Sequence, residues 1–294
     1  MQYPNGFLWG TATAAHQVEG GNSNCDCWVM EHAKNTFFME PSGDACDQYH
    51  RYREDIELLA SLGFNSYRFS IEWARIEPED GEFSAAQLEH YRRMLAACHE
   101  RKLVPVITFH HFTSPRWIAA RGGWENPETA ERFARFCERA TRHLGDMIGV
   151  ACTLNELNST VLLQDLAILP PDDKIVRLRA RVAAAESMGV AAEQFSAFPF
   201  CSTSRACTVA LEAHQRSVEV LRSGPGKFPV GMTLALHDMQ AIPGGEVHRD
   251  RVRREAEDIF MEAARGDDFV GVQTYSRVRF GPEGVLRSEP GVEL

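Results

Sequence analysis

The sequence has no excess of positive charge and no long apolar run. Its 31 Lys and Arg residues are outnumbered by 41 Asp and Glu residues, which gives a net charge of −10. Binding to a nucleic-acid backbone needs a clustered positive surface, so we expect no nucleic-acid partner. No stretch reaches the roughly 18 apolar residues of a membrane helix, and the start, MQYPNGFLWG, does not resemble a signal peptide. We therefore expect a cytoplasmic protein with no membrane partner.

Paired cysteine motifs are also absent. The eight cysteines are scattered through a chain much longer than disulfide-stapled domains, and we expect them to be reduced thiols. Cys25 and Cys27 lie near His32, a combination of residue types that zinc sites also use. A single residue between the two cysteines is too short for the usual zinc knuckle, and no second pair follows. We expect no metal and no organic cofactor.

The chain does contain a regular alternation of apolar runs and amphipathic segments, with 44% hydrophobic and 24% charged residues overall. Such alternation is typical of β/α units around a parallel sheet, whose strands are buried on both faces. The predicted strands are Phe7–Ala14, Phe64–Ile71, Leu103–His110, Gly149–Leu154, Phe228–Leu236 and Phe269–Tyr275. The predicted helices are Asp47–Leu62, Ser84–Arg101, Asn126–Leu144, Thr203–Arg222 and Arg249–Arg265, and Ile168–Phe200 is predicted to be a long excursion.

The number of units is too small for a closed barrel. A (β/α)₈ barrel needs eight strands, whereas six are predicted and the last residues, FGPEGVLRSEPGVEL, contain no further strand–helix unit. We predict an α/β fold of the TIM-barrel type, incomplete, in a single domain that spans residues 1–294. Such a sheet has two open edges, and these make self-association possible.

The end of the fourth predicted strand carries the first candidate for chemistry, the pair Asn155-Glu156. In β/α barrels the carboxyl ends of the strands carry the active site. A shielded carboxyl group there can have a raised pKa and donate a proton to a departing glycosidic oxygen, while a neighbouring amide holds a sugar hydroxyl. Taken alone, the pair is also compatible with a helix cap followed by an acid in the first turn.

Other strand ends carry hydrogen-bonding groups too. The third strand ends in His110-His111, and because side chains alternate, only one of these histidines is expected to face inward. An arginine inside a barrel, such as Arg68 on the second strand, is costly unless it meets a carboxylate. Further polar groups are Gln17 after the first strand, Ser70 on the second, and Gln273 and Tyr275 on the sixth. Together these residues predict a site that binds a polyol.

At these residues the chain resembles glycoside hydrolase family 1, the β-glucosidase and β-galactosidase family. The matching stretches are FLWGTATAAHQVEG, DQYHRYREDIELLASLGFNSYRFSIEWARIEP, VPVITFHHFTSP, GGWENPE, TLNEL and FVGVQTYSR. They run through nearly the whole chain in the family's order. The resemblance implies a (β/α)₈ fold and a small β-glycoside or oligosaccharide as the substrate.

The resemblance also implies roles for individual residues. Glu156 corresponds to the general acid/base and Asn155 to the residue that holds the 2-hydroxyl. The glycone binders correspond to Gln17 and His111, and the residues that support the nucleophile correspond to Arg68 and Tyr275. Trp124 is expected to be structural, because a large indole is usually buried. Three residues depart from the family pattern: Leu157 replaces a proline, Phe112 a tryptophan and Gln273 an asparagine.

The largest departure is the missing nucleophile. In the family it is a glutamate in an I/V-T-E-N-G stretch on strand seven, and neither this stretch nor the strand-eight segment that follows occurs here. A retaining glycosidase needs two carboxyl groups about 5–5.5 Å apart. Glu72, just after the second strand, is the other acid to consider, but we expect an exposed loop carboxylate paired with an arginine.

Three interpretations follow. In the first, the chain is part of a retaining β-glycosidase that hydrolyses terminal β-linked sugars, truncated before the nucleophile strand and inactive by itself. In the second, it is a non-catalytic descendant that binds a sugar or a protein partner through the same pocket. In the third, another chain or self-association through the open edges completes the barrel.

Overall fold

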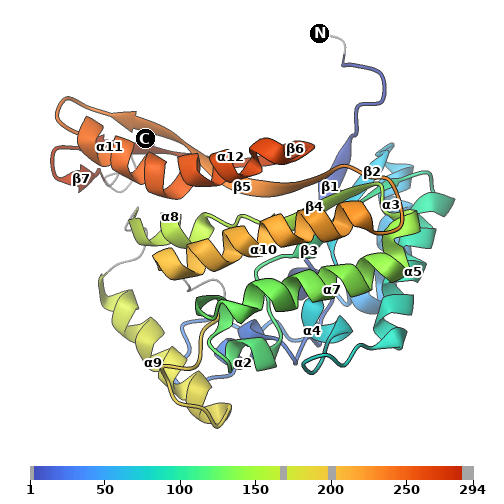
Figure 1. Ribbon diagram of the computed structural model, residues 1–294, viewed down its shortest axis with the longest axis horizontal. Helices are drawn as coiled ribbons and strands as arrows, with labels where there is room; N and C mark the ends of the chain where they lie inside the picture. Colours follow the sequence, from blue (N-terminus) through green and yellow to red (C-terminus); the bar gives the residue numbers. More distant parts are fainter. Residues whose placement is uncertain (1–2, 166–170, 198–202, 287–294) are drawn as a thin grey trace.

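The computed structural model describes residues 3–165, 171–197 and 203–286, which form one sheet covered by helices (Figure 1). The strands lie in the order β1-β2-β3-β4-β5-β6-β7. Neighbours from β1 to β6 are parallel, and β7 is antiparallel to β6. The strands are β1 (Gly10–Ala12), β2 (Ser66–Ser70), β3 (Val104–His110), β4 (Val150–Asn155), β5 (Val230–Ala241), β6 (Phe269–Gly281) and β7 (Gly284–Val285).

All six predicted parallel strands form, and the incomplete barrel is confirmed, although several lengths differ from the prediction. β1 is shorter because Phe7 and Trp9 before it lie exposed and contact the ring of Tyr3 instead of entering the sheet. β5 and β6 are longer because their parallel pairing resumes after an irregularity and continues to the end of β5. Their extension forms a two-stranded ribbon (Figure 1), and Arg277 in β6 pairs with Asp238 in β5 at 2.7 Å.

The helices form an outer layer around the sheet and a set of short segments near the strand ends. The long ones are α3 (Gln48–Ser61), α5 (Ala85–Glu100), α7 (Glu128–Leu144), α9 (Pro171–Ser187) and α10 (Ser204–Ser223). The short ones are α1 (Ala15–Val18), α2 (Asp26–Glu31), α4 (Trp73–Ile76), α6 (Arg116–Ala119), η1 (Gly123–Glu125), η2 (Gly145–Met147), α8 (Ser159–Asp165), α11 (Glu246–Arg253), η4 (Arg254–Asp258), α12 (Ile259–Ala263) and η5 (Ala264–Gly266). Within the described ranges, no helix combines the length and the apolar character needed to cross a membrane.

The predicted helices are largely confirmed, and local chemistry explains their ends. α3 buries Tyr52 and Ile56, whereas Leu62, at the end of the predicted helix, is 65% exposed. The chain after α3 turns at Gly63, whose φ of +85° favours glycine. The side chain of Asn126 accepts a hydrogen bond from the backbone N–H of Glu128 at 3.0 Å, as expected of a cap for α7.

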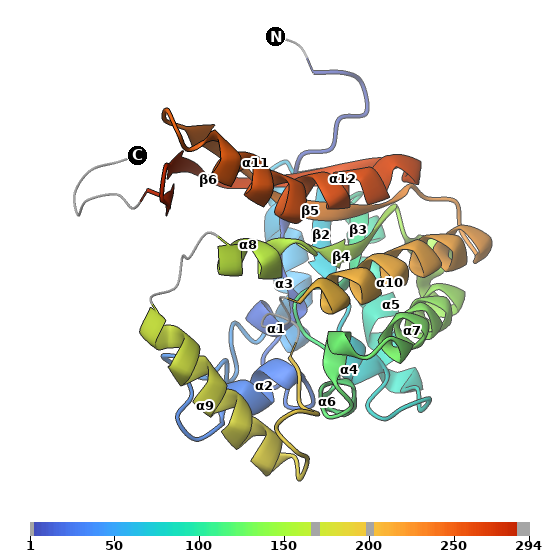
Figure 2. The same cartoon turned by 60° about the vertical axis from the view of Figure 1, so that its left-hand side comes forward.

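Two predicted segments are organised differently. The helix predicted over Arg249–Arg265 is interrupted by the π-helical turn η4, in which Glu257 accepts a hydrogen bond from the backbone N–H of His237 at 2.9 Å. The segment predicted as an excursion, Ile168–Phe200, contains the helix α9, while its two ends fall outside the described residues. Figure 2 shows α9 beside α2, away from the sheet.

An aromatic cluster forms the centre of the core between the sheet and α7. Trp73 stacks on Phe136 with ring centroids 5.4 Å apart, and Phe133 contacts both rings. Trp124 is fully buried, and its indole N–H donates to Ser114 at 3.1 Å. Trp124 is therefore a core residue, as predicted.

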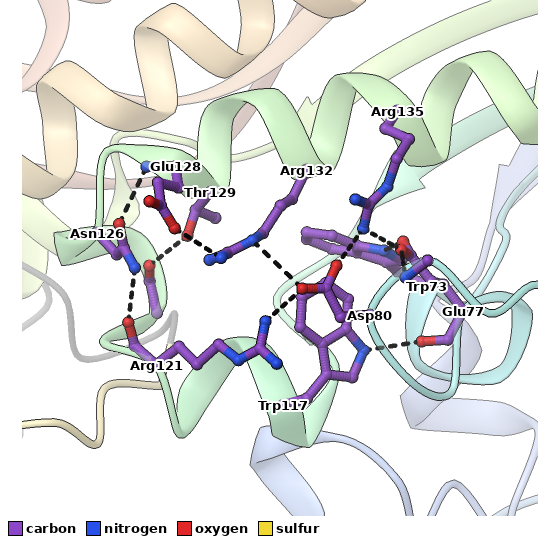
Figure 3. A network of polar contacts seen from close by, with 12 residues as sticks. Trp73, Glu77, Asp80, Trp117, Arg121, Asn126, Glu128, Thr129, Arg132 and Arg135 are labelled. Carbon is purple, nitrogen blue, oxygen red and sulfur yellow. Dashed lines mark hydrogen bonds and ion pairs between the residues drawn. The ribbon is translucent and has the colours of Figure 1, made fainter.

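A network of charged groups ties the loop after β2 to α6 and α7 (Figure 3). Asp80 accepts hydrogen bonds from Arg121 and, at 2.5 Å, from Arg135. Arg135 also donates to the fully buried carboxylate of Glu77, which accepts the indole N–H of Trp73 at 2.7 Å. Burial raises the pKa of Glu77, and its hydrogen bonds to Trp73, Gly81 and Arg135 oppose that rise. The network fixes the loop that begins at the carboxyl end of β2.

The sheet leaves both of its edges open within the described part of the chain. β1 pairs with β2 on one side, and the first half of β6 pairs with β5 on one side. As a consequence, Val272 and Tyr275 of β6 are 51% and 67% exposed. A groove of about 630 Å³ follows this edge between α12 and β6. In a closed barrel two further strand–helix units join the two open edges of the sheet.

Candidate active site

Glu156 directly follows β4 at its carboxyl end and is buried, with 7% of its surface exposed. Its φ of +46° lies in the left-handed region, which is uncommon for any residue with a side chain and which clusters at functional sites. The backbone N–H of Glu156 donates to the carbonyl of Thr233 in β5 at 2.7 Å, and Tyr275 donates its hydroxyl to the Glu156 carboxylate.

The environment of Glu156 favours its protonated form. Burial raises the pKa of this carboxyl group, and the Tyr275 hydrogen bond and the Arg68 charge offset only part of the rise. Burial and the neighbouring carboxylate also raise the pKa of Tyr275, to about 12, so the phenol remains a donor. A carboxyl group with a raised pKa in a strand-end pocket is suited to donating a proton.

The side chain of Asn155 is held by three neighbours. Its Oδ1 accepts hydrogen bonds from Arg68 Nη2 at 2.6 Å, Thr233 Oγ1 at 3.0 Å and Gln273 Nε2 at 3.0 Å. Its Nδ2 makes no hydrogen bond to the described residues. Because the oxygen is fully occupied, the orientation of the amide is fixed and the nitrogen is left to donate to a ligand.

Arg68 is half-buried on β2 and bonded to neutral oxygens. In addition to Asn155, its guanidinium donates to Thr108 Oγ1 at 2.9 Å and to Thr233 Oγ1 at 3.2 Å. Among the described residues, no carboxylate lies within 4.0 Å of this guanidinium, so the direct carboxylate partner that the sequence argument required is not there.

The two consecutive histidines after β3 have different surroundings. His110 is buried, shares a hydrogen bond with Ser114 at 3.0 Å and packs against Trp124. His111 is half-buried beside Phe112, and its Nδ1 has no hydrogen-bond partner among the described residues. Burial and the charge of Arg68 lower the pKa of His111 to about 3, so its imidazole is neutral. A neutral imidazole with an open nitrogen is able to bind a hydroxyl group.

Gln17 stands apart from this cluster. It lies on α1 directly after β1, and its side chain is exposed and makes no hydrogen bond to the described residues. The structure therefore brings Arg68, Asn155, Glu156 and Tyr275 into one hydrogen-bonded group, and places Gln17 and His111 at neighbouring strand ends without such contacts.

Glu72 differs from the sequence expectation. It is buried, with 2% of its surface exposed, and it caps α4 by accepting the backbone N–H of Ala74 at 3.2 Å. Its other oxygen accepts the hydroxyl of Thr113 at 2.8 Å. The prediction of an exposed loop carboxylate was wrong, because the cap and the threonine hold the side chain inside the molecule.

Sequence reasoning missed Thr108 and Thr233, although both belong to the hydrogen-bonded group around Arg68 and Asn155. Their position in the sequence is the signal that could have identified these two threonines. Each threonine lies in an apolar run near the carboxyl end of a strand, where a hydroxyl group needs an inward-facing partner.

A family model described as "Glycosyl hydrolase family 1" matches residues 1–278 of the chain. The chain belongs to glycosyl hydrolase family 1. The sequence motifs predicted this family of O-glycosyl hydrolases. Among solved structures, the β-glycosidase BGL167 of this family superposes with a TM-score of 0.93 at 52% identity, over 99% of this chain and 70% of that one.

Curated family 1 relatives include two β-glucosidases of bacteria. Thermostable β-glucosidase B of Thermobispora bispora is 31% identical over 97% of this chain and 62% of its own length. β-Glucosidase A of Acetivibrio thermocellus is 37% identical over 62% of this chain and 42% of its own. The chain thus spans less than two thirds of either relative.

Proposed function

We propose that this chain carries the acid/base half of a retaining β-glycosidase site that hydrolyses terminal β-linked sugars, such as β-glucosides. The observation that carries the proposal is the buried Glu156, which receives the Tyr275 hydroxyl and stands beside the clamped amide of Asn155. In this mechanism the Glu156 carboxyl group protonates the departing glycosidic oxygen. It later takes a proton from the water that releases the sugar.

The substrate contacts follow from the groups that remain open. Asn155 Nδ2 is free to donate to the sugar hydroxyl next to the cleaved bond, because Oδ1 is occupied by three donors. The open nitrogen of His111 and the exposed amide of Gln17 bind hydroxyl groups further along the sugar. No cofactor is needed, because both steps are acid–base chemistry on oxygen.

The nucleophile is the part of the reaction that these 294 residues do not supply. We propose that its carboxylate belongs beside Arg68, whose guanidinium contacts only neutral oxygens here and requires a negative partner inside a barrel. Arg68 then supports that carboxylate, and Tyr275 does so when its single O–H turns from Glu156 to the nucleophile. The 294-residue chain by itself has little or no turnover.

A chimera tests the proposal. Residues 1–278 are joined to the remaining carboxyl-terminal part of β-glycosidase BGL167, and hydrolysis of a nitrophenyl β-glucoside is measured for the chain alone and for the chimera. We expect turnover only in the chimera, with a loss of at least about 1,000-fold in the Glu156→Gln chimera and no loss in the exposed control Glu128→Gln. Full activity of the chain alone, or of the Glu156→Gln chimera, contradicts the assignment.

A second candidate is a non-catalytic descendant that binds a sugar or a partner through the same pocket. It is favoured by the complete set of hydrogen bonds around Asn155, which leaves the amide nitrogen directed at a ligand whether or not the site turns over. Calorimetry with a non-hydrolysable β-glucoside separates the two: binding that persists without any turnover in the chimera supports the descendant.

Three further properties belong to the same proposal. Residues 1–294 form one partial barrel domain, the open edges of β1 and β6 allow self-association, and the protein is cytoplasmic. The cytoplasmic location is supported by the seven described cysteines, all of which are free thiols; Cys201 lies outside the described residues. Size-exclusion chromatography across a range of concentrations tests self-association.

A further inference from the structure

A buried group of metal-ligating side chains lies beneath the first strand end. His16 on α1 and the pair Cys27 and Glu31 on α2 place one ligand atom each within 4.8 Å of one another, and all three residues are buried. Cys27 and Glu31 are four positions apart, so they project from the same face of α2. His32, which the sequence suggested as a ligand, lies exposed against Trp28 instead.

We propose that His16, Cys27 and Glu31 form a zinc site that fixes α1 to α2. Ligand atoms around tetrahedral zinc are about 3.4–3.6 Å apart, so small side-chain shifts bring these three atoms, which lie within 4.8 Å of one another, to a zinc ion. His16 Nε2 and Glu31 Oε1 are 2.8 Å apart across a shared proton, and they move slightly apart when the metal takes the place of that proton. Imidazole, thiolate and carboxylate are all established zinc ligands, and a water molecule completes the four.

The surroundings of the ligands match those of metal sites. Glu31 Oε2 accepts two hydrogen bonds from Ser42, at 3.0 Å from its backbone N–H and 2.8 Å from its hydroxyl, which leaves Oε1 directed at His16. Neighbours that hold the far side of a ligand in this way orient metal ligands and tune their affinity.

Asn22 supplies an independent observation. It is 2% exposed, and in the part of the chain that the structure describes its Oδ1 has no hydrogen-bond partner, while its Nδ2 lies 3.3 Å from His16 Nδ1. The two ends of an asparagine amide are exchanged by a half-turn of the side chain. After that turn Oδ1 accepts the Nδ1–H of His16, which is the arrangement that a histidine needs when its Nε2 binds a metal.

The charge around the site is negative. Asp26 and Glu72 are both buried close by. Burial lowers the pKa of His16, but the hydrogen bond with Glu31 and the charges of Glu72, Glu31 and Asp26 raise it overall. For Cys27, burial is the largest cause and raises the pKa well above its ordinary value. Binding of Zn²⁺ releases the Cys27 thiol proton and the proton that His16 shares with Glu31. The dication then balances one thiolate and one carboxylate.

Metal analysis of the purified 294-residue chain tests the site. After dialysis against a chelator and addition of zinc, we expect one equivalent of zinc per chain. Cobalt in its place gives a thiolate-to-cobalt charge-transfer band. Calorimetry in two buffers with different ionisation enthalpies reports the release of two protons. These readouts do not depend on glycosidase activity, so a failure here leaves the proposed function untouched.

Matched variants assign the ligands. Cys27→Ser and Glu31→Gln are each expected to weaken zinc binding by at least about 100-fold, and Cys27→Ser abolishes the charge-transfer band. Cys98→Ser, at a buried thiol on α5, leaves the zinc affinity and the charge-transfer band unchanged. Circular dichroism checks that each variant folds. If Cys27→Ser does not fold, Glu31→Gln still tests the site, because glutamine retains the shape of the glutamate side chain. Absence of stoichiometric zinc, or a cobalt band of equal strength in Cys27→Ser, overturns the proposal and leaves a plain His16–Glu31 ion pair.

Discussion

Replacing Tyr275 by phenylalanine is predicted to raise the pKa of Glu156 further. The hydroxyl of Tyr275 donates to the ionised carboxylate and is one of the two interactions that oppose the effect of burial. A hydrogen bond to a charged group contributes about 1.5–3 kcal/mol. Tyr275 is 67% exposed, and water replaces part of its contribution. We therefore expect the ionised Glu156 carboxylate to lose about 1.4 kcal/mol of stabilisation, and the pKa of Glu156 to rise.

The sign of the stability effect follows from the direction of the shift. A carboxyl group whose pKa is raised by folding favours the folded state at pH values below its unfolded pKa. That contribution is lost as the pH rises through the folded pKa. In Tyr275→Phe the folded pKa is higher still, so the variant is less stable than the parent near neutral pH and equally stable in acid.

Titration of the side-chain carboxyl carbons by NMR measures the Glu156 pKa directly, with Glu156→Gln to assign the signal. Tyr3→Phe is the matched control, because Tyr3 is also exposed and contacts Phe7 and Trp9 rather than Glu156. An unchanged or lower Glu156 pKa in Tyr275→Phe refutes the reasoning, since the hydroxyl then does not stabilise the carboxylate.

Three further substitutions test the fold and the site. Trp124→Ala creates a cavity in the core and is expected to lower the unfolding free energy by about 3–5 kcal/mol in chemical denaturation, against no more than about 0.5 kcal/mol for the exposed Trp9→Ala. Asp80→Asn is expected to lower the unfolding free energy by about 2 kcal/mol at neutral pH. Burial raises the Asp80 pKa, but Arg135 and Arg121 outweigh it and lower the pKa overall, so the variant and the parent become equally stable as the pH falls through that pKa. Glu72→Gln is expected to destabilise the chain by about 1 kcal/mol through its cap and to leave hydrolysis by the chimera within about twofold of the parent, whereas a loss of several hundredfold makes Glu72 a catalytic group.

Short-range patterns in the sequence were sufficient for the architecture and for the position of Glu156 at a strand end. Apolar runs and caps act within a few residues, which is why all six parallel strands and the helix that begins after Asn126 were predicted. The Asn155-Glu156 pair was predicted as a site because parallel strands all end at the same edge of the sheet, so the last residues of one strand lie beside those of its neighbours. No further contact is needed for that conclusion.

Contacts between distant segments decided the rest. The lengths of β5 and β6 depend on how the two strands pair with each other, and the burial of Glu72 depends on Thr113, 41 positions away. The triple clamp on Asn155 joins β2, β5 and β6, and the proposed zinc ligands join α1 to α2. The sequence by itself determined which residues reach the mouth of the barrel. Only the tertiary structure decided which of them touch, because hydrogen-bond geometry depends on the relative placement of strands that are far apart along the chain.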